Sequence, residues 1–489
     1  MVEVDEKPYV HIDKTRIGLR GKEPSILVSL GVIALLAVIL LVGTAVMSMP
    51  IEMAMFFGMV ILMMLMIATG FSYQEVQDSA FDSIRKVVEL LFILLAVGML
   101  ISSWAMSGTI PTIIKIGLET IHPSWFFVTA MLLCSVTSLV TGTSWGTMGS
   151  VGVALMAVGN GLGIYAPLTA GAVISGAYFG DKLSVLSDST NLSAAITGTP
   201  LMTHVRYMLH TTAPAYVLTM ITFGVLGFMV PQTGNAGSAI GDIVKGLDTS
   251  YKLGYITLIP IVVTVGMLLF KLPPFVSIMG GAVAGAILAV AYQGMSLLDV
   301  TEGLYSGYVS DTGQEGIDKL VSGGGMMAMA GLVLLFMFAV GVSGLLYLGG
   351  YVHALLGVVL KWANTRRRIM VLASPTMIAS IGLGASYSFG AVMVGTLFTP
   401  GFKKLGLKSQ NLSRTLEDSG TVYDPFFPWS GGGVFAAGVL GVATLEYMPF
   451  MFFAYFSTLV ALVVSLTQYK VAAFEPENVE AVQEPVSSP

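Results

Sequence analysis

Long apolar runs, interrupted by short polar segments, extend along most of this sequence. Between Glu23 and Glu75 the only charged residue is Glu52, and this interval holds the apolar runs 26–47 and 51–70. Because a membrane-spanning helix needs about 20 such residues, the pattern predicts a hairpin of two spans. The same reasoning predicts two further spans, at 253–270 and 275–291.

Two longer stretches are uncharged, and the second of them does not divide into whole crossings. Residues 126–180 and 369–402 contain no Asp, Glu, Lys or Arg, and basic clusters flank the second stretch on both sides. That stretch is too short for two crossings of about 20 residues each and too long for one. We therefore expect re-entrant hairpins, with tips at Thr141–Thr147 and Ser386–Ser388. Such backbone is tolerated only where protein or a water-filled cavity surrounds it.

The charged loops predict an orientation, because short cytoplasmic loops are enriched in Lys and Arg. Acidic or uncharged loops, at 231–241 and 302–318, are expected outside. This assignment places both termini in the cytoplasm and predicts about ten crossings. The basic residues expected inside are Lys14, Arg16, Arg20, Lys22, Arg85, Lys86, Arg206, Arg366, Arg367, Arg368, Lys403, Lys404, Lys408 and Lys470.

Polar landmarks recur in the same order in the two halves of the chain. Ser107-Gly108, Ser144, Asp181 and Asp188 pair, at nearly constant separation, with Ser343-Gly344, Ser386, Asp418 and Asp424. The first copy begins at a basic flank and the second at an acidic one, so the repeat is predicted to be inverted. The expected domains are a cytoplasmic segment 1–24, a two-span hairpin 25–84, inverted repeat 1 at 85–231, two connecting spans within 232–320, inverted repeat 2 at 321–469 and a disordered cytoplasmic tail 470–489.

Composition supports a membrane protein. Of the 489 residues 55% are hydrophobic and only 10% are charged, and the mean hydropathy is +0.84, whereas soluble proteins carry about 25% charged residues. The net charge of −5 and the single Cys exclude a nucleic-acid-binding protein and a disulfide scaffold. The predicted fold is therefore an all-α polytopic membrane protein with two inverted-topology repeats and broken helices.

Two polar clusters interrupt what would otherwise be single long crossings. The first carries Asp181 and Asp188, and the second carries Glu417, Asp418 and Asp424. An ionisable group at mid-membrane costs about 2.5–3.5 kcal/mol on insertion scales, so it indicates function. Broken helices rich in Asp, Ser, Thr and Asn offer carboxylate, hydroxyl and carbonyl oxygens to a small cation.

These carboxylates are expected to bind a cation and a proton alternately. A carboxyl group removed from water holds its proton more tightly, whereas a bound Na⁺ favours the ionised form. The two cations therefore compete for one site, and no cofactor is required. Oxygen ligands are expected from Thr143, Ser144, Thr147, Ser187, Asn191, Ser386 and Thr421, with Na⁺ itself at Asp188, Ser187, Asn191, Thr143 and Ser144.

Several alternatives compete with this interpretation. Asp181 can pair with the adjacent Lys182, and Asp418 with Arg414 one helical turn earlier. The segment 142–146 (GTSWG) also matches the G-x-S-x-G pattern of serine hydrolases, with His204 or His210 as the base. That motif requires a strand–turn–helix context that a membrane sequence lacks. A passive channel is the other alternative, although it does not require two duplicated acidic clusters.

The combined motifs resemble those of the NhaC-type sodium/proton antiporter family. They are TSWGT at 143–147, GDKLS at 180–184, SDSTNL at 187–192, RTLEDSGT at 414–421 and PW at 428–429. The resemblance covers residues 26–470 and implies sodium/proton antiport in a bacterial-type inner membrane. It also implies re-entrant hairpins, a homodimer surrounded by membrane lipid and an elevator-like movement. Relatives that exchange lactate for malate, or that carry amino acids, leave an organic substrate open.

Overall fold

The computed structural model describes residues 24–229 and 236–474, which form helices α1 to α24 joined by short turns. Two isolated bridges, Tyr308 with Gly323 and Leu407 with Ala473, are the extended pairings within these ranges. The predicted all-α fold is confirmed. The predicted N-terminal segment 1–24 and tail 470–489 lie largely outside the described residues.

Seven helices in the described part of the chain are long and apolar enough to cross a membrane, and up to nine spans result if each of two bent pairs counts as one. The predicted spans 26–47, 51–70 and 275–291 coincide with such helices, and 253–270 belongs to a bent pair. The count of about ten crossings stays a prediction. The seven helices are Ile26–Val46, Ile51–Ala68, Val88–Met106, Pro123–Thr141, Leu201–Met229, Pro274–Gln293 and Met326–Leu348.

The chain forms two compact units. The first comprises the described part of Met1–Lys86 and the segment Phe338–Val359. It contains α1 (Ile26–Leu41), α2 (Ile51–Ala68) and α3 (Tyr73–Arg85), with parts of α17 (Ala330–Leu348) and α18 (Tyr351–Trp362). Within it α3 and α17 are in close contact, because the Ser79 hydroxyl donates to the Gly344 carbonyl at 2.9 Å.

The second unit, Val87–Met337 with Leu360–Pro489, contains two similar successions of helices. In the first, a helical hairpin (hairpin 1, residues 126–161) is followed by a helix broken at residues 184–187 (break 1) and then by a long helix. The elements are α4 (Val88–Met106), α5 (Thr109–Thr120), α6 (Phe126–Thr141), α7 (Ser144–Thr147), α8 (Val153–Gly161), α9 (Ala166–Leu183), α10 (Asp188–Thr197) and α11 (Leu201–Met229).

The second succession has the same order with a longer break. Hairpin 2 (residues 366–404) precedes a helix broken at residues 419–430 (break 2), and a final helix follows. The elements are α19 (Arg366–Gly384), α20 (Tyr387–Lys404), α21 (Gln410–Asp418), α22 (Gly431–Leu440), α23 (Thr444–Tyr447) and α24 (Phe452–Thr467). That the two copies are oppositely oriented in the membrane stays a prediction.

The two hairpins turn in the same way, at the predicted tips. Gly142 and Ala385 adopt left-handed backbone conformations (φ 75° and 54°). Thr143 and Ser386 then cap the next helix through their side chains. Ser386 therefore corresponds to Thr143, and the sequence pairing of Ser386 with Ser144 is wrong by one residue.

The lengths of the two breaks correct a second pairing. Asp188 is the first residue of α10, and the first residue of α22 is Gly431. Asp424 instead belongs to a 3₁₀ turn, Thr421–Phe426, inside break 2. Asp188 and Asp424 therefore do not occupy equivalent positions, because break 2 is the longer segment.

Glycines allow α9 to lie directly against α6. A Cβ atom on Gly176 would meet the Met131 carbonyl oxygen at 2.3 Å, and one on Gly180 would meet the Ser135 carbonyl oxygen at 2.5 Å. The Ser138 hydroxyl donates to the Ala177 carbonyl at 2.6 Å across the same contact. Small residues permit such close packing of membrane helices. This contact brings the end of α9, with Asp181, close to the tip of hairpin 1.

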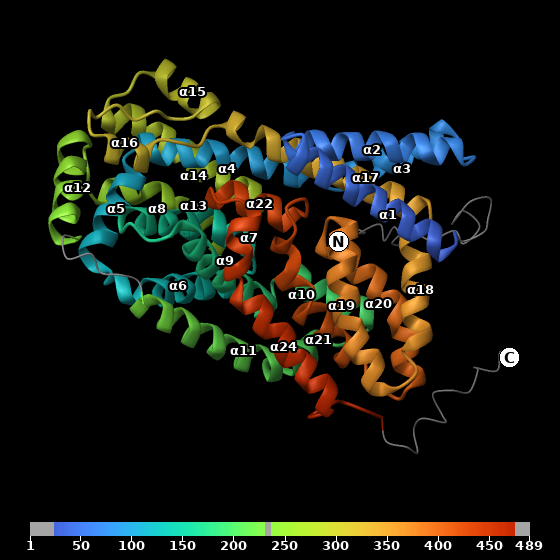
Figure 1. Cartoon of the computed structure of the whole chain (residues 1–489). Coiled ribbons are helices and arrows are strands. Elements are labelled where there is room, and N and C mark those ends of the chain that lie inside the picture. Colours follow the sequence, from blue (N-terminus) through green and yellow to red (C-terminus); the bar gives the residue numbers. More distant parts are fainter. Residues whose placement is uncertain (1–23, 230–235, 475–489) are drawn as a thin grey trace, which may run out of the picture. The chain divides into compact units, whose positions relative to one another are not determined.

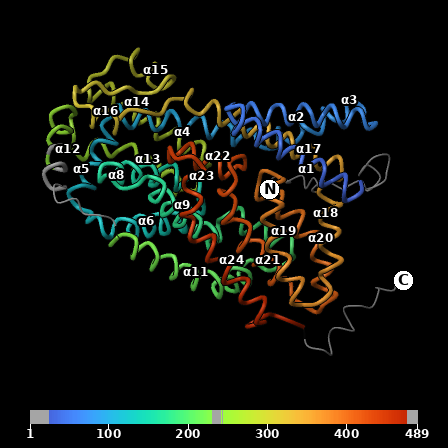
Figure 2. Tube along the Cα trace, viewed as in Figure 1, coloured from blue at the N-terminus to red at the C-terminus, as the bar shows by residue number. Residues whose placement is uncertain are grey.

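Segments from the two successions are interleaved in this unit. Helix α10 packs against α20 and α21, and α11 packs against α21 and α24. Figure 1 and Figure 2 show α10, coloured green, among the orange helices of the second succession. Both breaks therefore lie in the same region of the unit.

The connection between the two successions contains α12 (Ala236–Ser250), α13 (Ile259–Leu269), α14 (Pro274–Leu288), α15 (Leu297–Ser306) and α16 (Glu315–Val321). Its acidic loop is ordered by Asp318. This carboxylate accepts hydrogen bonds from the Thr312 backbone N–H at 2.8 Å and from the Ser310 hydroxyl at 2.7 Å. These bonds stabilise the ionised form and hold the pKa of Asp318 below its usual value.

Candidate functional site

Six charged side chains are buried in the described part of the chain, and all six come from the two polar clusters. Four are acidic and two are basic. His204, which can also carry a charge, is buried as well. The six are Asp181, Lys182, Arg414, Glu417, Asp418 and Asp424.

Asp418 is held in an ion-paired network. Lys182 Nζ lies 2.5 Å from Asp418 Oδ1, and neither side chain is accessible to solvent. Arg414 Nε lies 3.4 Å from the other carboxylate oxygen, one helical turn earlier on α21. Thr211 of α11 donates to Asp418, and Ser457 of α24 binds Lys182 at 2.9 Å. Lys182 lies at the end of α9 before break 1, and Asp418 lies at the end of α21 before break 2. Lys182 thus pairs with Asp418 and not with its neighbour Asp181.

Asp181 faces the tip of hairpin 1. Its carboxylate accepts a hydrogen bond of 2.7 Å from the Ser144 hydroxyl. It is 8% exposed, and no described cationic side chain forms an ion pair with it.

Glu417 is bonded by a tyrosine that sequence reasoning did not single out. The Tyr387 hydroxyl lies 2.8 Å from Glu417 Oε1. The same hydroxyl lies 3.1 Å from the Ser189 carbonyl oxygen and 2.5 Å from the Ser193 hydroxyl. Glu417 Oε2 is buried with no hydrogen-bond partner in the described ranges. Tyr387, the first residue of α20, thereby connects hairpin 2 to α10 and α21.

Asp424 is enclosed by backbone. Its Oδ1 accepts a hydrogen bond of 3.1 Å from the Tyr387 N–H. A Cβ atom on Gly432 would lie 2.3 Å from Asp424 Oδ2 and 2.6 Å from the Tyr178 hydroxyl. The tip of hairpin 2 is also tied to break 2, because the Gly431 N–H donates to the Ala385 carbonyl at 2.9 Å.

The three carboxylates without an ion pair belong to one electrostatic cluster. The charge of Asp181 acts on both Glu417 and Asp424. With all four acids ionised, Lys182 and Arg414 supply two positive charges too few. An uncompensated buried charge is costly, so the cluster favours the uptake of cations or protons.

Asp188 occupies a different environment. It is exposed at the start of α10, and it forms no ion pair with a described residue. The expectation of a deeply buried Asp188 is therefore wrong: break 1 turns its side chain outward. Its charge still acts on Asp181.

The proposed oxygen ligands divide into two groups. Three hydroxyls serve the local backbone: Thr143 and Ser386 cap helices, and Thr147 donates to the Thr143 carbonyl at 2.9 Å. The exposed Asn191 donates to the Ser187 carbonyl at 2.7 Å and so stabilises break 1.

The remaining members of the set are Ser144, Ser187 and Thr421. Ser187 is buried, with its hydroxyl 3.0 Å from that of Ser189. Thr421 lies beside Glu417, and its buried hydroxyl has no well-aligned partner in the described ranges. The structure therefore brings Ser144 and Ser187 to Asp181 and Thr421 to Glu417, and not to Asp188.

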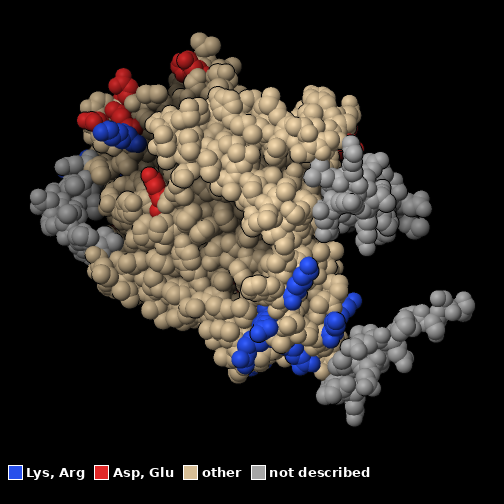
Figure 3. Space-filling model, turned by 45° about the vertical axis from the view of Figure 1, so that its right-hand side comes forward, with Lys and Arg blue, Asp and Glu red and all other residues tan. Residues whose placement is uncertain are grey.

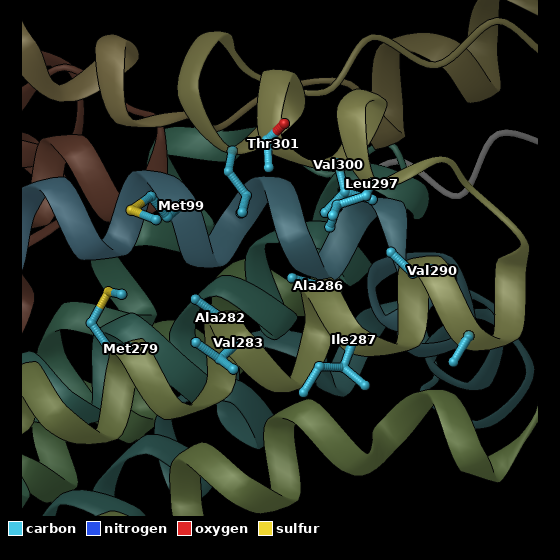
Figure 4. A pocket seen from close by; sticks show the side chains of 12 residues that line it. Met99, Met279, Ala282, Val283, Ala286, Ile287, Val290, Leu297, Val300 and Thr301 are labelled. Carbon is cyan, nitrogen blue, oxygen red and sulfur yellow. The ribbon is translucent and has the colours of Figure 1, made fainter.

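No group of three or more His, Cys, Asp or Glu side chains within residues 24–229 and 236–474 is arranged to hold a metal ion. The donors at the cluster are carboxylates and hydroxyls, which are hard oxygen ligands. A separate cavity of about 380 Å³ lies among α4, α14 and α15 (Figure 4). It is lined by apolar side chains such as Met99, Ile287 and Leu297, and it contains none of the carboxylates.

The arrangement required for a serine hydrolase is not formed. Ser144 lies at a helix–turn–helix tip and donates to Asp181. His204 Nδ1 is bonded to the Ser413 hydroxyl at 2.9 Å, and His210 Nδ1 lies 3.1 Å from the Tyr207 carbonyl oxygen. Neither histidine contacts Ser144.

Comparison with known proteins identifies relatives along most of the chain. Residues 176–467 match the Na⁺/H⁺ antiporter family. The malate-2H⁺/Na⁺-lactate antiporter of Bacillus subtilis is 36% identical over 430 residues, 87% of this chain and 91% of that protein. The Na⁺/H⁺ antiporter NhaC of Alkalihalophilus pseudofirmus is 34% identical, over 79% and 83% of the two chains. The arginine/ornithine antiporter of Halobacterium salinarum is 33% identical over 98% of each.

The ion pair of Lys182 and Asp418 predicts coupled stability. Lys182→Met should lower the thermal unfolding temperature, because removing one partner of a buried pair costs about 3–5 kcal/mol. The double variant Lys182→Met/Asp418→Asn should be less destabilised than the two single changes combined. Thermal unfolding of the four purified proteins in one detergent measures this. Strictly additive effects would show that the pair is not coupled.

The enclosure of Asp424 predicts a steric effect at Gly432. Gly432→Ala places a methyl group against the Asp424 carboxylate and should abolish transport while the protein still assembles in the membrane. Gly266→Ala in α13, where a Cβ would meet nothing within 4 Å, is the matched control. Transport in vesicles and membrane protein yield are measured for both variants. Wild-type activity of Gly432→Ala would remove Asp424 from the site.

Proposed function

The chain belongs to the Na⁺/H⁺ antiporter family, and we propose that it exchanges Na⁺ for H⁺ at a buried cluster formed by Asp181, Glu417 and Asp424. Membership of this family makes it a multi-pass membrane transporter. The sodium–proton exchange, and the residues that perform it, are supported by the geometry of the two helix breaks.

The observation that carries the proposal is the shortage of positive charge at the cluster. Four buried carboxylates are accompanied by two buried cations, and Asp418 uses both of them. Two further positive charges, from protons or metal cations bound at the other three acids, would bring the region to neutrality. Because an empty, charged cluster is costly inside a membrane, the loaded states favour movement across the bilayer.

Na⁺ and H⁺ compete at this cluster because both bind to the same oxygen atoms. A Na⁺ ion would be held by carboxylate oxygen of Asp181 together with hydroxyl oxygen such as that of Ser144. Protonation of the same carboxyl group removes its negative charge and releases the metal ion. Asp188 and Asn191, exposed at break 1, are proposed to act on the approach to the site.

The oligomeric state, the location and the transport movement are proposed from the resemblance to the NhaC-type family. We propose a homodimer in a bacterial-type inner membrane, with both termini cytoplasmic. The two successions of helices would act as inverted repeats, and an elevator-like movement would expose the cluster alternately to each side.

Exchange of an organic ion is the second candidate. It is favoured by Arg414, whose buried Nη2 has no hydrogen-bond partner in the described ranges. A guanidinium with free donors suits a carboxylate. The names of two relatives, a malate/lactate and an arginine/ornithine antiporter, agree with such a substrate.

A proteoliposome assay tests the main proposal. Adding external Na⁺ to vesicles that contain the protein and an internal pH-sensitive dye should raise the internal pH, because protons leave as Na⁺ enters. Asp181→Asn, Glu417→Gln and Asp424→Asn should reduce this signal to that of protein-free vesicles. Asp188→Asn should weaken the apparent Na⁺ affinity and keep measurable exchange, because its exposed carboxylate acts on Asp181 only through its charge.

The same assay distinguishes the organic substrates. We expect the pH change in wild-type vesicles without malate, lactate, arginine or ornithine. If one of these solutes is absolutely required, the second candidate replaces the first. Full activity in all three carboxylate variants would exclude the cluster from ion binding.

The contacts of Tyr387 predict a graded effect. Tyr387→Phe keeps the backbone N–H that binds Asp424 and removes the hydroxyl that binds Glu417. The apparent Na⁺ affinity should change roughly tenfold, as expected for a hydrogen bond to a charged group. Tyr455→Phe, which removes a hydroxyl bonded to the Met448 carbonyl, is the control. An unchanged affinity in Tyr387→Phe would show that this hydroxyl does not influence the site.

A further inference from the structure

A pocket with basic and apolar walls lies in the second unit, among the ends of three helices. Its volume is about 550 Å³, within the range of roughly 300–1,000 Å³ typical of ligand pockets. It contains none of the carboxylates of the transport site. The pocket is lined by Lys361, Trp362, Asn364, Arg367, Arg368, Val371, Leu372 and Leu466.

The cations of this pocket are not neutralised by the protein. Lys361, Arg367 and Arg368 are exposed, and none forms an ion pair with a described residue. Arg368 Nη1 donates to the Asn364 side chain at 3.0 Å, which fixes its position and leaves its charge uncompensated. Figure 3 shows most of the basic side chains of the drawn face gathered at its lower end, and a further one beside the acidic side chains at the upper left.

Helix stability does not account for the arginines. They stand in the first turn of α19, where the helix dipole favours acidic side chains and disfavours basic ones. Their position therefore costs free energy unless an anion accompanies them.

The side chains that line the pocket change from basic to apolar, in the order in which a phospholipid changes from its charged headgroup to its apolar acyl chains. Arg367 and Arg368 are followed one turn later on α19 by Val371 and Leu372, and Leu466 near the end of α24 adds a further apolar side chain. Trp362, which is 71% exposed at the end of α18, has the character of a residue at a membrane–water interface. A free phosphate would use only the basic wall.

We propose that this pocket binds an anionic phospholipid from the leaflet expected to face the cytoplasm. The lipid phosphate would contact Lys361, Arg367 and Arg368, and an acyl chain would lie against Val371, Leu372 and Leu466. Basic pockets between membrane helices on the cytoplasmic side suit such headgroups.

The test uses the full-length protein, purified in detergent and delipidated. Native mass spectrometry then follows the binding of phosphatidylglycerol, phosphatidylcholine and soluble glycerol phosphate. We compare wild type with Arg367→Gln/Arg368→Gln and with Arg85→Gln/Lys86→Gln. The second pair removes the same charge from two consecutive basic residues that do not line the pocket and are also expected inside. Size-exclusion chromatography and sodium-driven exchange establish that each variant is folded.

We expect phosphatidylglycerol to bind wild type and the control pair equally. The arginine double variant should bind it at least about tenfold more weakly, since each basic residue near a membrane surface contributes appreciably to binding of anionic lipid. Phosphatidylcholine should bind more weakly to wild type. Leu372→Ser should weaken the binding of phosphatidylglycerol and leave the binding of glycerol phosphate unchanged.

Three results would overturn the proposal: equal phosphatidylglycerol binding by the arginine variant, equal binding of the two lipids, or glycerol phosphate binding as tightly as the lipid. The last result would assign the pocket to a soluble anion. If the double variant is misfolded, Lys361→Gln and Leu372→Ser are judged by the same measurements. Loss of sodium-driven exchange by the carboxylate variants is independent of every one of these outcomes.

Discussion

The structure of the second unit depends on placing four carboxylates inside a membrane protein with two buried basic side chains beside them among the described residues. The protein pairs both basic groups with one acid, Asp418, and leaves the other three acids to hydroxyl groups and backbone N–H groups. Ion pairing is thereby confined to Asp418, and the other three buried acids form no ion pair with a described residue. Asp181 and Lys182, adjacent in sequence, therefore differ, because Lys182 is ion-paired and Asp181 accepts a hydrogen bond from Ser144 instead.

The helical packing makes this separation possible. Glycine contacts bring α9 against α6, so that Asp181 reaches the tip of hairpin 1. Break 2 folds back onto the tip of hairpin 2 through Gly431 and Asp424. Each tip therefore contacts the break of its own succession, and the interleaving of α10 with α20 and α21 joins the two halves.

Much of this arrangement could be predicted from the sequence, because it follows from apolar length and from polar residues at the breaks. The spans, both hairpin tips and the segments that carry the buried acids are visible as interruptions of hydrophobic runs. The side-chain partners were not predictable. Nothing in the order of residues indicates that Lys182 turns from Asp181 toward Asp418, 236 positions later, or that Asp188 points outward.

Tyr387 shows a second limit of the sequence. It was visible as one residue of a hairpin tip, but its role depends on a contact between α20 and two helices that pattern analysis treats separately. Tyr178, Thr211 and Ser457 were missed for the same reason, since each meets groups that come from other helices far away in the sequence. A polar side chain directly after a capping residue at a tip, as at Ser386–Tyr387, is the one local sign that could have indicated Tyr387.

The position of Tyr387 has a mechanical consequence. One phenolic oxygen is shared by a glutamate of α21 and by two groups of α10, while the amide of the same residue holds Asp424. Because the ring is rigid, it cannot move without altering the contacts of Glu417 and of α10 together, so this one residue ties the two successions of helices to each other.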